Sequence, residues 1–277
     1  MKIDIQSIVG WGLYHICRPF TALSEVSSIY FHNPSPTAFE RIIKWAKRQG
    51  YTFIRIPDML KYMRSGEKAQ GRQMLITFDD AWRGNLELVP IIEKYQVPIT
   101  IFAPITPLQE GNYWWEYAQK EGGRVLSDEM KQYDENLFGE KVRILQERHT
   151  LSRSAIAMEE LKQLSQHPLV DIESHSYTHP ILTNISDASL EKELRESQQY
   201  LQDYLEKPVR YFCYPNGSLT QRELDRAKVY YDCAFSTLQA NPQAGGDRYA
   251  IPRYALTDNY WSNLAKIIGA WSKFIRR

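Results

Sequence analysis

The 277-residue sequence has little cysteine, almost no net charge and no long hydrophobic run. Its three cysteines, Cys17, Cys213 and Cys233, are odd in number and widely spaced, which argues against a disulfide framework and favours a reducing compartment. A formal net charge of +1 gives no electrostatic reason to expect nucleic acid as a partner. Because a membrane-spanning helix needs about 18 or more apolar residues in a row, no segment is expected to cross a bilayer.

The N-terminal residues include an early acid, Asp4, and lack an extended apolar core, so they match a secretory signal peptide poorly. We therefore expect a cytoplasmic protein, with the inner membrane face as the alternative location. With 43% hydrophobic and 24% charged residues, the composition is that of a globular protein. A chain of this length can bury a full core as a single domain.

An apolar run over residues 75–78 ends at two adjacent acids, Asp79 and Asp80. Such a run is typical of a buried parallel strand, and α/β folds place their chemistry at the C-terminal ends of these strands. Adjacent strand residues point to opposite faces, so both acids can serve one site only if the strand is ending there. A surface acidic pair is the alternative.

A second short run, residues 169–173, is followed by His175 and His179. Two imidazoles four residues apart can hold one ion if the backbone turns helically between them. Together with one carboxylate they would complete an open three-ligand metal site. The second carboxylate would then be free to take a proton from a water molecule. Two unrelated histidines are the alternative.

The segments Thr-Phe-Asp-Asp at 77–80 and His-Ser-Tyr-Thr-His at 175–179 resemble two motifs of the NodB-type polysaccharide deacetylases, carbohydrate esterase family 4. The resemblance implies that Asp79 is the general base. It also implies three ligands for a divalent metal ion, which are Asp80, His175 and His179. Zn²⁺ is the simplest candidate, and other first-row metals suit the same nitrogen and oxygen donors.

Two positions depart from the family pattern. Ala81 stands where the family usually has Gly, and Ala is expected to remove the freedom for a positive φ. Residues 209–217 resemble the third family motif, but Cys213 occupies the place of its arginine. The arginine that orients the base must then come from elsewhere, with Arg253 as the first candidate and Arg210 as the second.

The third motif also carries the triplet Pro-Asn-Gly in place of Pro-Tyr-Gly. The resemblance implies that the backbone N–H of Asn216 contributes to the oxyanion hole. Tyr214, in the same motif, is a candidate for substrate binding.

Many NodB enzymes take a catalytic acid from a C-terminal histidine motif, yet no histidine follows His179 here. In circularly permuted members, which resemble the poly-N-acetylglucosamine deacetylases, the corresponding strand opens the domain. Residues 8–16 fit a strand that ends at His15, which makes His15 the candidate acid, with a structural histidine as the alternative. Three other histidines lie in polar or inserted stretches: His32, His149 and His167.

Helix and strand signals alternate along most of the chain. Residues 34–49 predict a helix, 51–56 a strand, 86–95 a helix and 99–103 a strand. This is the rhythm of a parallel sheet. With the resemblance, it predicts an α/β fold, a deformed (β/α) barrel of the NodB type that forms one catalytic domain over residues 1–277.

The rhythm breaks over about residues 104–168, which predicts an inserted aromatic and helical segment. Its aromatic cluster, which includes Trp114 and Trp115, is either a packing anchor or a wall on which a sugar ring stacks. A helix predicted over residues 186–205 carries a polar run that we interpret as a solvated face.

The C-terminal residues 260–277 place Trp261, Leu264, Ile268, Trp271 and Ile275 on one helical face, with basic residues around it. Such a stripe either packs on its own domain or makes a peripheral membrane contact.

These features predict a metal-dependent hydrolase that removes N-acetyl groups from an amino sugar. The expected partner is an N-acetylated sugar or oligosaccharide, or a glycan linked to a lipid or a nucleotide. The alternatives are a deacylase for a formyl or O-acetyl group and a catalytically silent carbohydrate-binding relative. The retained Asp79 favours an enzyme, because metal binding alone does not need it.

Overall fold

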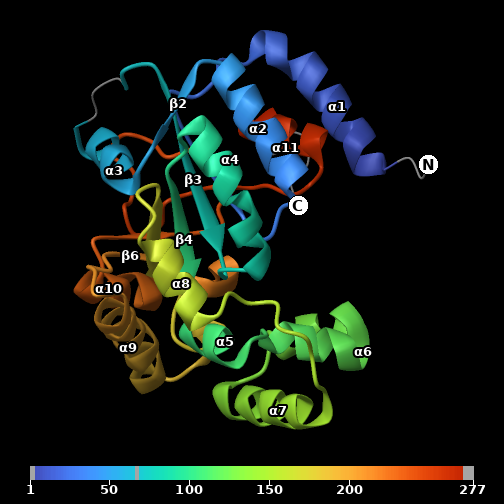
Figure 1. Cartoon of the computed structure of the whole chain (residues 1–277), viewed down its shortest axis with the longest axis vertical. Coiled ribbons are helices and arrows are strands. Elements are labelled where there is room, and N and C mark those ends of the chain that lie inside the picture. The colour runs from blue at the N-terminus through green and yellow to red at the C-terminus, as the bar shows by residue number, and fades with distance from the viewer. Residues whose placement is uncertain (1–3, 66–68, 271–277) are drawn as a thin grey trace.

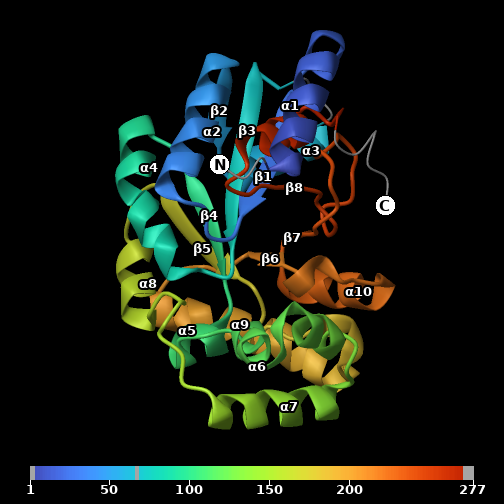
Figure 2. The ribbon, with the colours of Figure 1, turned by 90° about the vertical axis from the view of Figure 1, so that its right-hand side faces the viewer.

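The computed structural model describes residues 4–65 and 69–270. A curled sheet runs through the middle of the molecule, with helices packed around it (Figures 1 and 2). Its strands are β1 (Val26–Phe31), β2 (Tyr51–Ile54), β3 (Arg72–Asp79), β4 (Ile99–Ala103), β5 (Val170–Ser174), β6 (Tyr211–Cys213), β7 (Cys233–Phe235) and β8 (Tyr254–Ala255).

The α-helices are α1 (Ile5–Cys17), α2 (Pro36–Arg48), α3 (Ile56–Ser65), α4 (Val89–Tyr95), α5 (Ile105–Glu110), α6 (Trp114–Met130), α7 (Glu135–Arg148), α8 (Met158–Ser165), α9 (Asp187–Leu205), α10 (Gln221–Tyr230) and α11 (Tyr260–Ile267). Short 3₁₀ turns are η1 (Arg18–Phe20), η2 (Arg83–Leu88), η3 (Leu182–Asn184) and η4 (Pro215–Gly217). In the part of the chain that the structure describes, none of these helices has the length and apolar character needed to cross a membrane.

The strands follow the order β7-β6-β5-β4-β3-β1-β8, and β2 pairs with the first half of β3. All pairings between these strands are parallel. The segment 251–255 joins the two edges, because Ile251 bridges to Phe235 of β7 while Tyr254 and Ala255 pair with β1. The predicted α/β architecture, a deformed barrel with surrounding helices, is confirmed.

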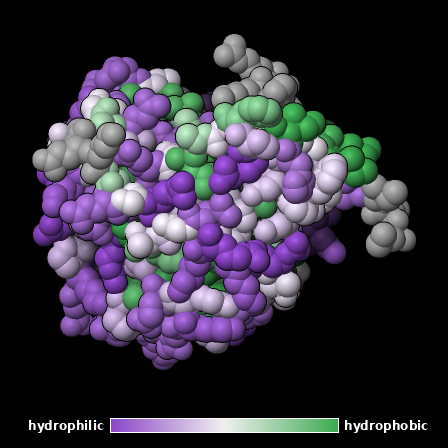
Figure 3. Space-filling model, turned by 90° about the horizontal axis from the view of Figure 1, so that it is seen from above, coloured by the Kyte–Doolittle hydropathy of each residue, from purple (hydrophilic) through white to green (hydrophobic). Residues whose placement is uncertain are grey.

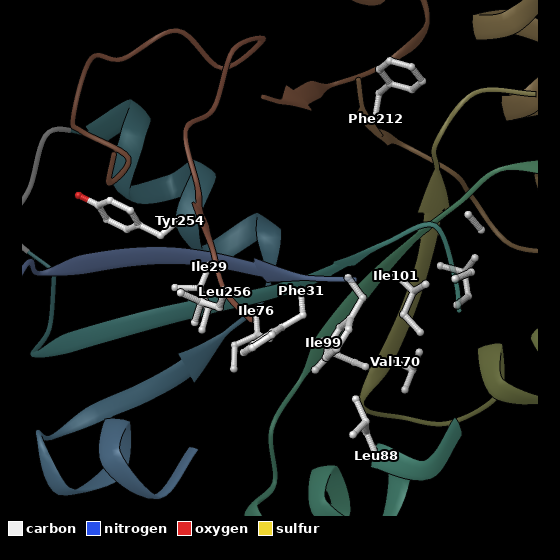
Figure 4. Packing of buried hydrophobic residues seen from close by; sticks show 14 of the residues in the cluster. Ile29, Phe31, Ile76, Leu88, Ile99, Ile101, Val170, Phe212, Tyr254 and Leu256 are labelled. Atoms are coloured by element: carbon white, nitrogen blue, oxygen red, sulfur yellow. The ribbon is translucent and has the colours of Figure 1, made fainter. Parts of the chain in front are cut away.

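The core follows from the apolar runs of the central strands. Ile29 of β1, Ile76 of β3 and Ile101 of β4 are all completely buried, and their side chains lie on neighbouring strands (Figure 4). Burying a side chain of this size stabilises the fold by about 1.5–3 kcal/mol. Because parallel strands end at a common edge, this packed core fixes the positions of the loops that leave β1, β3 and β5.

The helix predicted over residues 34–49 is α2, capped by Ser35, whose hydroxyl accepts from the Ala38 N–H. The strand predicted over residues 8–16 is wrong. Those residues form α1, whose N-terminus is capped by the Asp4 carboxylate. A short apolar run does not distinguish a strand from a helix by periodicity alone. The strand that opens the sheet is β1.

The segment between β4 and β5 contains α5 to α8, and α6 and α7 stand together at one end of the molecule (Figure 1). The helix α6 is interrupted at Gly122 and Gly123, which have non-helical backbone angles. Trp114, Met130 and Leu145 form a separate small core beneath this pair of helices. The aromatic segment therefore anchors a helical hairpin to the rest of the fold.

The apolar stripe of α11 packs on its own domain. Leu264 and Ile268 are buried, so the described residues support packing on the domain, and not membrane contact, of the two alternatives for this stripe. Trp271 and Ile275 lie outside them. The two helices α1 and α11 cross closely at Gly10, where an added Cβ would lie 2.5 Å from the Ser262 nitrogen.

Candidate active site

The backbone leaves the sheet at the two acids. Asp79 is the last residue of β3, and the next two residues, Asp80 and Ala81, have φ values of 74° and 58°. The expectation that Ala81 excludes a positive φ is therefore wrong. The left-handed conformation costs a non-glycine residue of order 1–3 kcal/mol, and this turn brings both carboxylates to one cavity.

That cavity has a volume of about 520 Å³. It contains most of the site residues that the sequence predicted, which are Asp79, Asp80, His175, His179, Asn216, Trp114, Trp115 and Tyr214. Arg253 lies behind its wall, and His15 is elsewhere in the fold.

Asp80 and the two histidines form a compact donor set. The Asp80 Oδ1 lies 3.3 Å from the Nε2 of His175 and 3.2 Å from the Nε2 of His179, and all three side chains are buried. The His175 Nδ1–H donates to the carbonyl of Cys213 (2.7 Å), so Nε2, which faces Asp80, is the atom that could bind a metal ion after losing its proton. One carboxylate oxygen and two imidazole nitrogens fit a divalent first-row metal.

The environment keeps Asp80 ionised. Burial alone would raise its pKa, but hydrogen bonds with His175 and His179 hold the pKa of Asp80 well below its usual range. The indole N–H of Trp82 also donates to Asp80 Oδ2 at 3.0 Å. The Asp80 carbonyl accepts from the Tyr113 hydroxyl at 2.8 Å, so the turn is held from both sides.

Asp79 has a different partner. The guanidinium of Arg253 donates from Nη1 to Asp79 Oδ1 (2.8 Å) and from Nη2 to Oδ2 (2.9 Å). Burial would raise the pKa of Asp79, but the charge and hydrogen bonds of Arg253 outweigh it and lower this pKa. Asp79 is thus a buried carboxylate that stays ionised.

Arg253 is itself completely buried and fully bound. Its remaining contacts are with Thr77 Oγ1 (2.8 Å), the Ser236 carbonyl (3.2 Å) and Cys213 Sγ (2.9 Å). The residue at the family's arginine position, Cys213, therefore contacts an arginine supplied by the segment just before β8. Arg210, the second candidate, is exposed and does not line the cavity.

A buried acid supports the histidine loop. Glu193 of α9 accepts from the Tyr177 N–H (2.7 Å), the Thr178 N–H (2.9 Å) and the Thr178 hydroxyl (2.6 Å). The interpretation of the polar run of α9 as a solvated face missed this residue. Its position one turn after Leu190 and beside Leu194, both completely buried, was the available signal.

The structure places His32, and not the predicted His15, at the cavity. His15 lies on α1, where its ring contacts Trp11, Tyr14 and Trp261. His32 directly follows β1, lines the cavity, and places Nε2 3.9 Å from Asp80 Oδ2. The signal that sequence reasoning missed was the apolar run 29–31 immediately before His32.

The third motif forms one wall of the cavity. Asn216, in η4, has a φ of 56°. Gly217 has no room for a side chain, since an added Cβ would lie 1.9 Å from Thr237 Oγ1. Tyr214 is almost completely buried, and its hydroxyl donates to the Tyr249 carbonyl at 3.0 Å. Tyr214 therefore supports the wall and does not present its hydroxyl to the cavity.

The aromatic cluster also lines the cavity. The Trp114 indole N–H donates to the carbonyl of His179 at 3.1 Å. The ring of Trp115 lies 4.7 Å from that of His179 and stacks on Tyr113. The cluster thus both anchors the inserted helices to the histidine loop and lines the cavity, so the two alternatives considered for it are compatible.

The family model described as polysaccharide deacetylase matches residues 66–230. A poly-beta-1,6-N-acetyl-D-glucosamine N-deacetylase of Staphylococcus aureus (strain MSSA476) is 24% identical over 259 residues, which are 89% of this chain and 74% of that protein. The protein of the same name from Staphylococcus epidermidis (strain RP62A) is 22% identical over 256 residues, 88% of this chain and 75% of the other.

Solved structures share the fold. IcaB from Ammonifex degensii superposes with a TM-score of 0.65 at 17% identity, covering 90% of this chain and 98% of that one. The Streptococcus pyogenes deacetylase PplD in complex with acetate has a TM-score of 0.62 at 15% identity, covering 88% and 99%. His32 and Arg253 lie outside the residues that the family model matches, so the site is completed by segments on either side of them.

Proposed function

The chain belongs to the polysaccharide deacetylase family, and we propose that it removes N-acetyl groups from an amino sugar in a glycan, with a divalent metal ion as cofactor. The observation that carries the proposal is the pair of adjacent acids in one cavity. Asp79 is held by an arginine, and Asp80 faces two imidazole nitrogens. One carboxylate is placed to take a proton and the other to bind an ion.

We propose a polymer or oligosaccharide of N-acetylglucosamine as the substrate. The two Staphylococcus relatives are named for activity on such a polymer, and each aligns with most of this chain. The cavity has room for a sugar ring, and Trp115 offers an aromatic face beside His179 on which a pyranose can pack.

Asp80, His175 and His179 would hold the ion. When bound, a divalent metal supplies a Lewis acid that polarises the acyl carbonyl and lowers the pKa of a water molecule. Zn²⁺ suits this donor set best, although other first-row metals are compatible with it.

The chain's own groups perform the proton transfers. Asp79 accepts the proton of the attacking water, while Arg253 fixes both of its oxygens. The backbone N–H of Asn216 donates to the oxyanion that develops on the acyl group. We assign the protonation of the leaving amine to His32, since it is the remaining histidine that lines the cavity.

The test is acetate release by the purified, metal-loaded protein from a β-1,6-linked N-acetylglucosamine oligosaccharide. Mass spectrometry of the sugar should show a loss of one acetyl group per free amine formed. Parallel reactions with N-formyl and O-acetyl sugars separate the alternative acyl groups. A protein that binds metal and sugar but releases no acyl group from any of them would be a silent relative, contrary to the proposal.

A further inference from the structure

The surface of α1 is unusually apolar. Among residues 4–65 and 69–270, ten large hydrophobic side chains are exposed, and six of them lie within residues 5–20. We call these six the apolar ridge: Ile5, Ile8, Val9, Trp11, Ile16 and Phe20. Figure 3 shows α1 as a green band beside a mostly purple surface. Patches of this kind usually mark an interaction site.

The fold points the ridge away from the protein. Ile5, Ile8 and Ile16 recur at helical spacing on the outer side of α1. The inner side is fixed by the close crossing at Gly10 and by Tyr14, whose hydroxyl accepts from the Trp45 indole N–H at 3.1 Å. No charged residue occurs between Asp4 and Arg18. Gln6 and His15 are the exposed polar side chains of α1, so its outer face lacks the acids, lysines and arginines that surface helices normally carry.

Basic side chains lie on the elements next to the ridge. On the adjacent helix α2, Arg41 and Arg48 are exposed, and Arg41 lies 4.1 Å above the ring of Tyr260 in α11. Arg18, at the end of α1, donates to the Gln49 side chain at 3.0 Å. The acid of α2, Glu40, is already paired with Lys44 and Lys94. Glu40 therefore does not neutralise Arg41 and Arg48, and Asp4, the N-cap of α1, is the acid that adjoins the ridge in the sequence.

We propose that the apolar ridge inserts into the interfacial layer of a bilayer that contains anionic lipid, with Arg41 and Arg48 at the level of the headgroups. Apolar side chains supply the burial and the arginines supply the attraction that interfacial helices use. A second copy of the chain would offer the same cations beside its own ridge, whereas an anionic lipid surface offers the complementary charge.

The experiment is flotation of the full chain with vesicles of phosphatidylcholine, with and without about 30% phosphatidylglycerol. The wild type should float with the anionic vesicles and much less with the neutral ones. Substituting Ile5→Gln, Ile8→Gln, Ile16→Gln and Phe20→Gln together should lower partitioning at least tenfold, because the apolar area that enters the interface is lost. Arg41→Gln and Arg48→Gln should each lower it about fivefold on anionic vesicles alone.

The matched control is Leu137→Gln with Val229→Gln, two exposed apolar residues outside the ridge, which should float as the wild type does. Circular dichroism checks that the variants fold. If the fourfold variant does not fold, the single variants Ile5→Gln and Phe20→Gln, at the most exposed positions, should each still reduce flotation severalfold.

Wild-type protein that stays in the soluble fraction with both vesicle types would overturn the proposal. Equal flotation of the ridge and control variants would do so as well. A concentration-dependent dimer in sedimentation velocity, lost in the ridge variant and without vesicle binding, would assign the ridge to a second copy of the chain instead.

Discussion

Asp79 and Asp80 are consecutive, line the same cavity and are almost equally buried, but their partners differ. Asp79 pairs with a guanidinium through both oxygens. Asp80 faces the Nε2 atoms of two imidazoles. A carboxylate beside a permanent cation stays ionised, whereas one beside two imidazoles can complete a ligand set. The comparison indicates that the partner, and not the residue type, distinguishes the roles that we propose for the two acids.

The backbone creates this difference. The left-handed turn at Asp80 and Ala81 lets consecutive side chains share a cavity although a regular strand would separate them. Each acid then meets a partner from a distant part of the chain. Changing one partner at a time can therefore tell the two roles apart.

The largest effect is expected for Asp80→Ala. Removing one of three ligands should lower metal affinity at least about a hundredfold and abolish turnover. Metal content is measured by mass spectrometry of the protein after dialysis against trace metal. Equal metal content in Asp80→Ala and wild type would place the ion elsewhere.

Asp79→Asn tests the role proposed for the other acid, which is to accept a proton. An amide cannot accept the water's proton, so kcat should fall by about 10²–10⁴ while metal content stays at the wild-type level. The measurement is acetate release at saturating metal. If kcat stays within a few-fold of wild type, Asp79 is not the base.

Comparing His32→Ala with His15→Ala tests whether the histidine that lines the cavity, and not the one on α1, protonates the leaving amine. The first should lower kcat about a hundredfold or more on an amide substrate, and much less on an aryl acetate whose leaving group needs no proton. The second should leave both rates near wild type, because His15 packs on α1 and α11. The reverse pattern would return the acid role to His15.

Arg253→Gln tests what the guanidinium does for Asp79. Because Arg253 lowers the pKa of Asp79 against the effect of burial, its removal should raise that pKa. The acidic limb of the kcat/KM profile should then move to higher pH, and Arg210→Gln should leave it unchanged. If the pH profile of kcat/KM is unchanged in Arg253→Gln, Arg253 contributes to packing and does not set the pKa of Asp79.

The smallest effect is expected at the turn itself. Ala81→Gly relieves the positive φ but loses a buried methyl group and adds freedom to the unfolded chain, so the free energy of unfolding should stay within about 0.5 kcal/mol of wild type. The control Ala46→Gly, buried in the helix α2, gains no such relief and should lose about 1–2 kcal/mol. Chemical denaturation distinguishes the two.

Several elements could be predicted from the sequence because their apolar residues are the ones that the fold buries. The run 75–78 before the acids is completely or almost completely buried in β3, and the amphipathic pattern of residues 34–49 became α2. The strand β1 was missed because Ser27 and Ser28 interrupt its apolar signal, although both are buried. Because β1 was missed, the sequence analysis proposed His15 as the catalytic acid and did not consider His32 for that role. Arg253 was proposed only because Cys213 stands where the family motif has an arginine, so another arginine had to be found.

Residues 251–255, which join the two edges of the sheet, are made late in translation. Arg253 reaches Asp79 across 174 residues of chain, and β8 completes the edge of β1. Translation therefore produces both acids and both histidines long before the guanidinium that pairs with Asp79. Until that segment is made and packs against the sheet, the buried Asp79 has no guanidinium partner. The cavity that holds both acids is complete only when translation has passed this last part of the barrel.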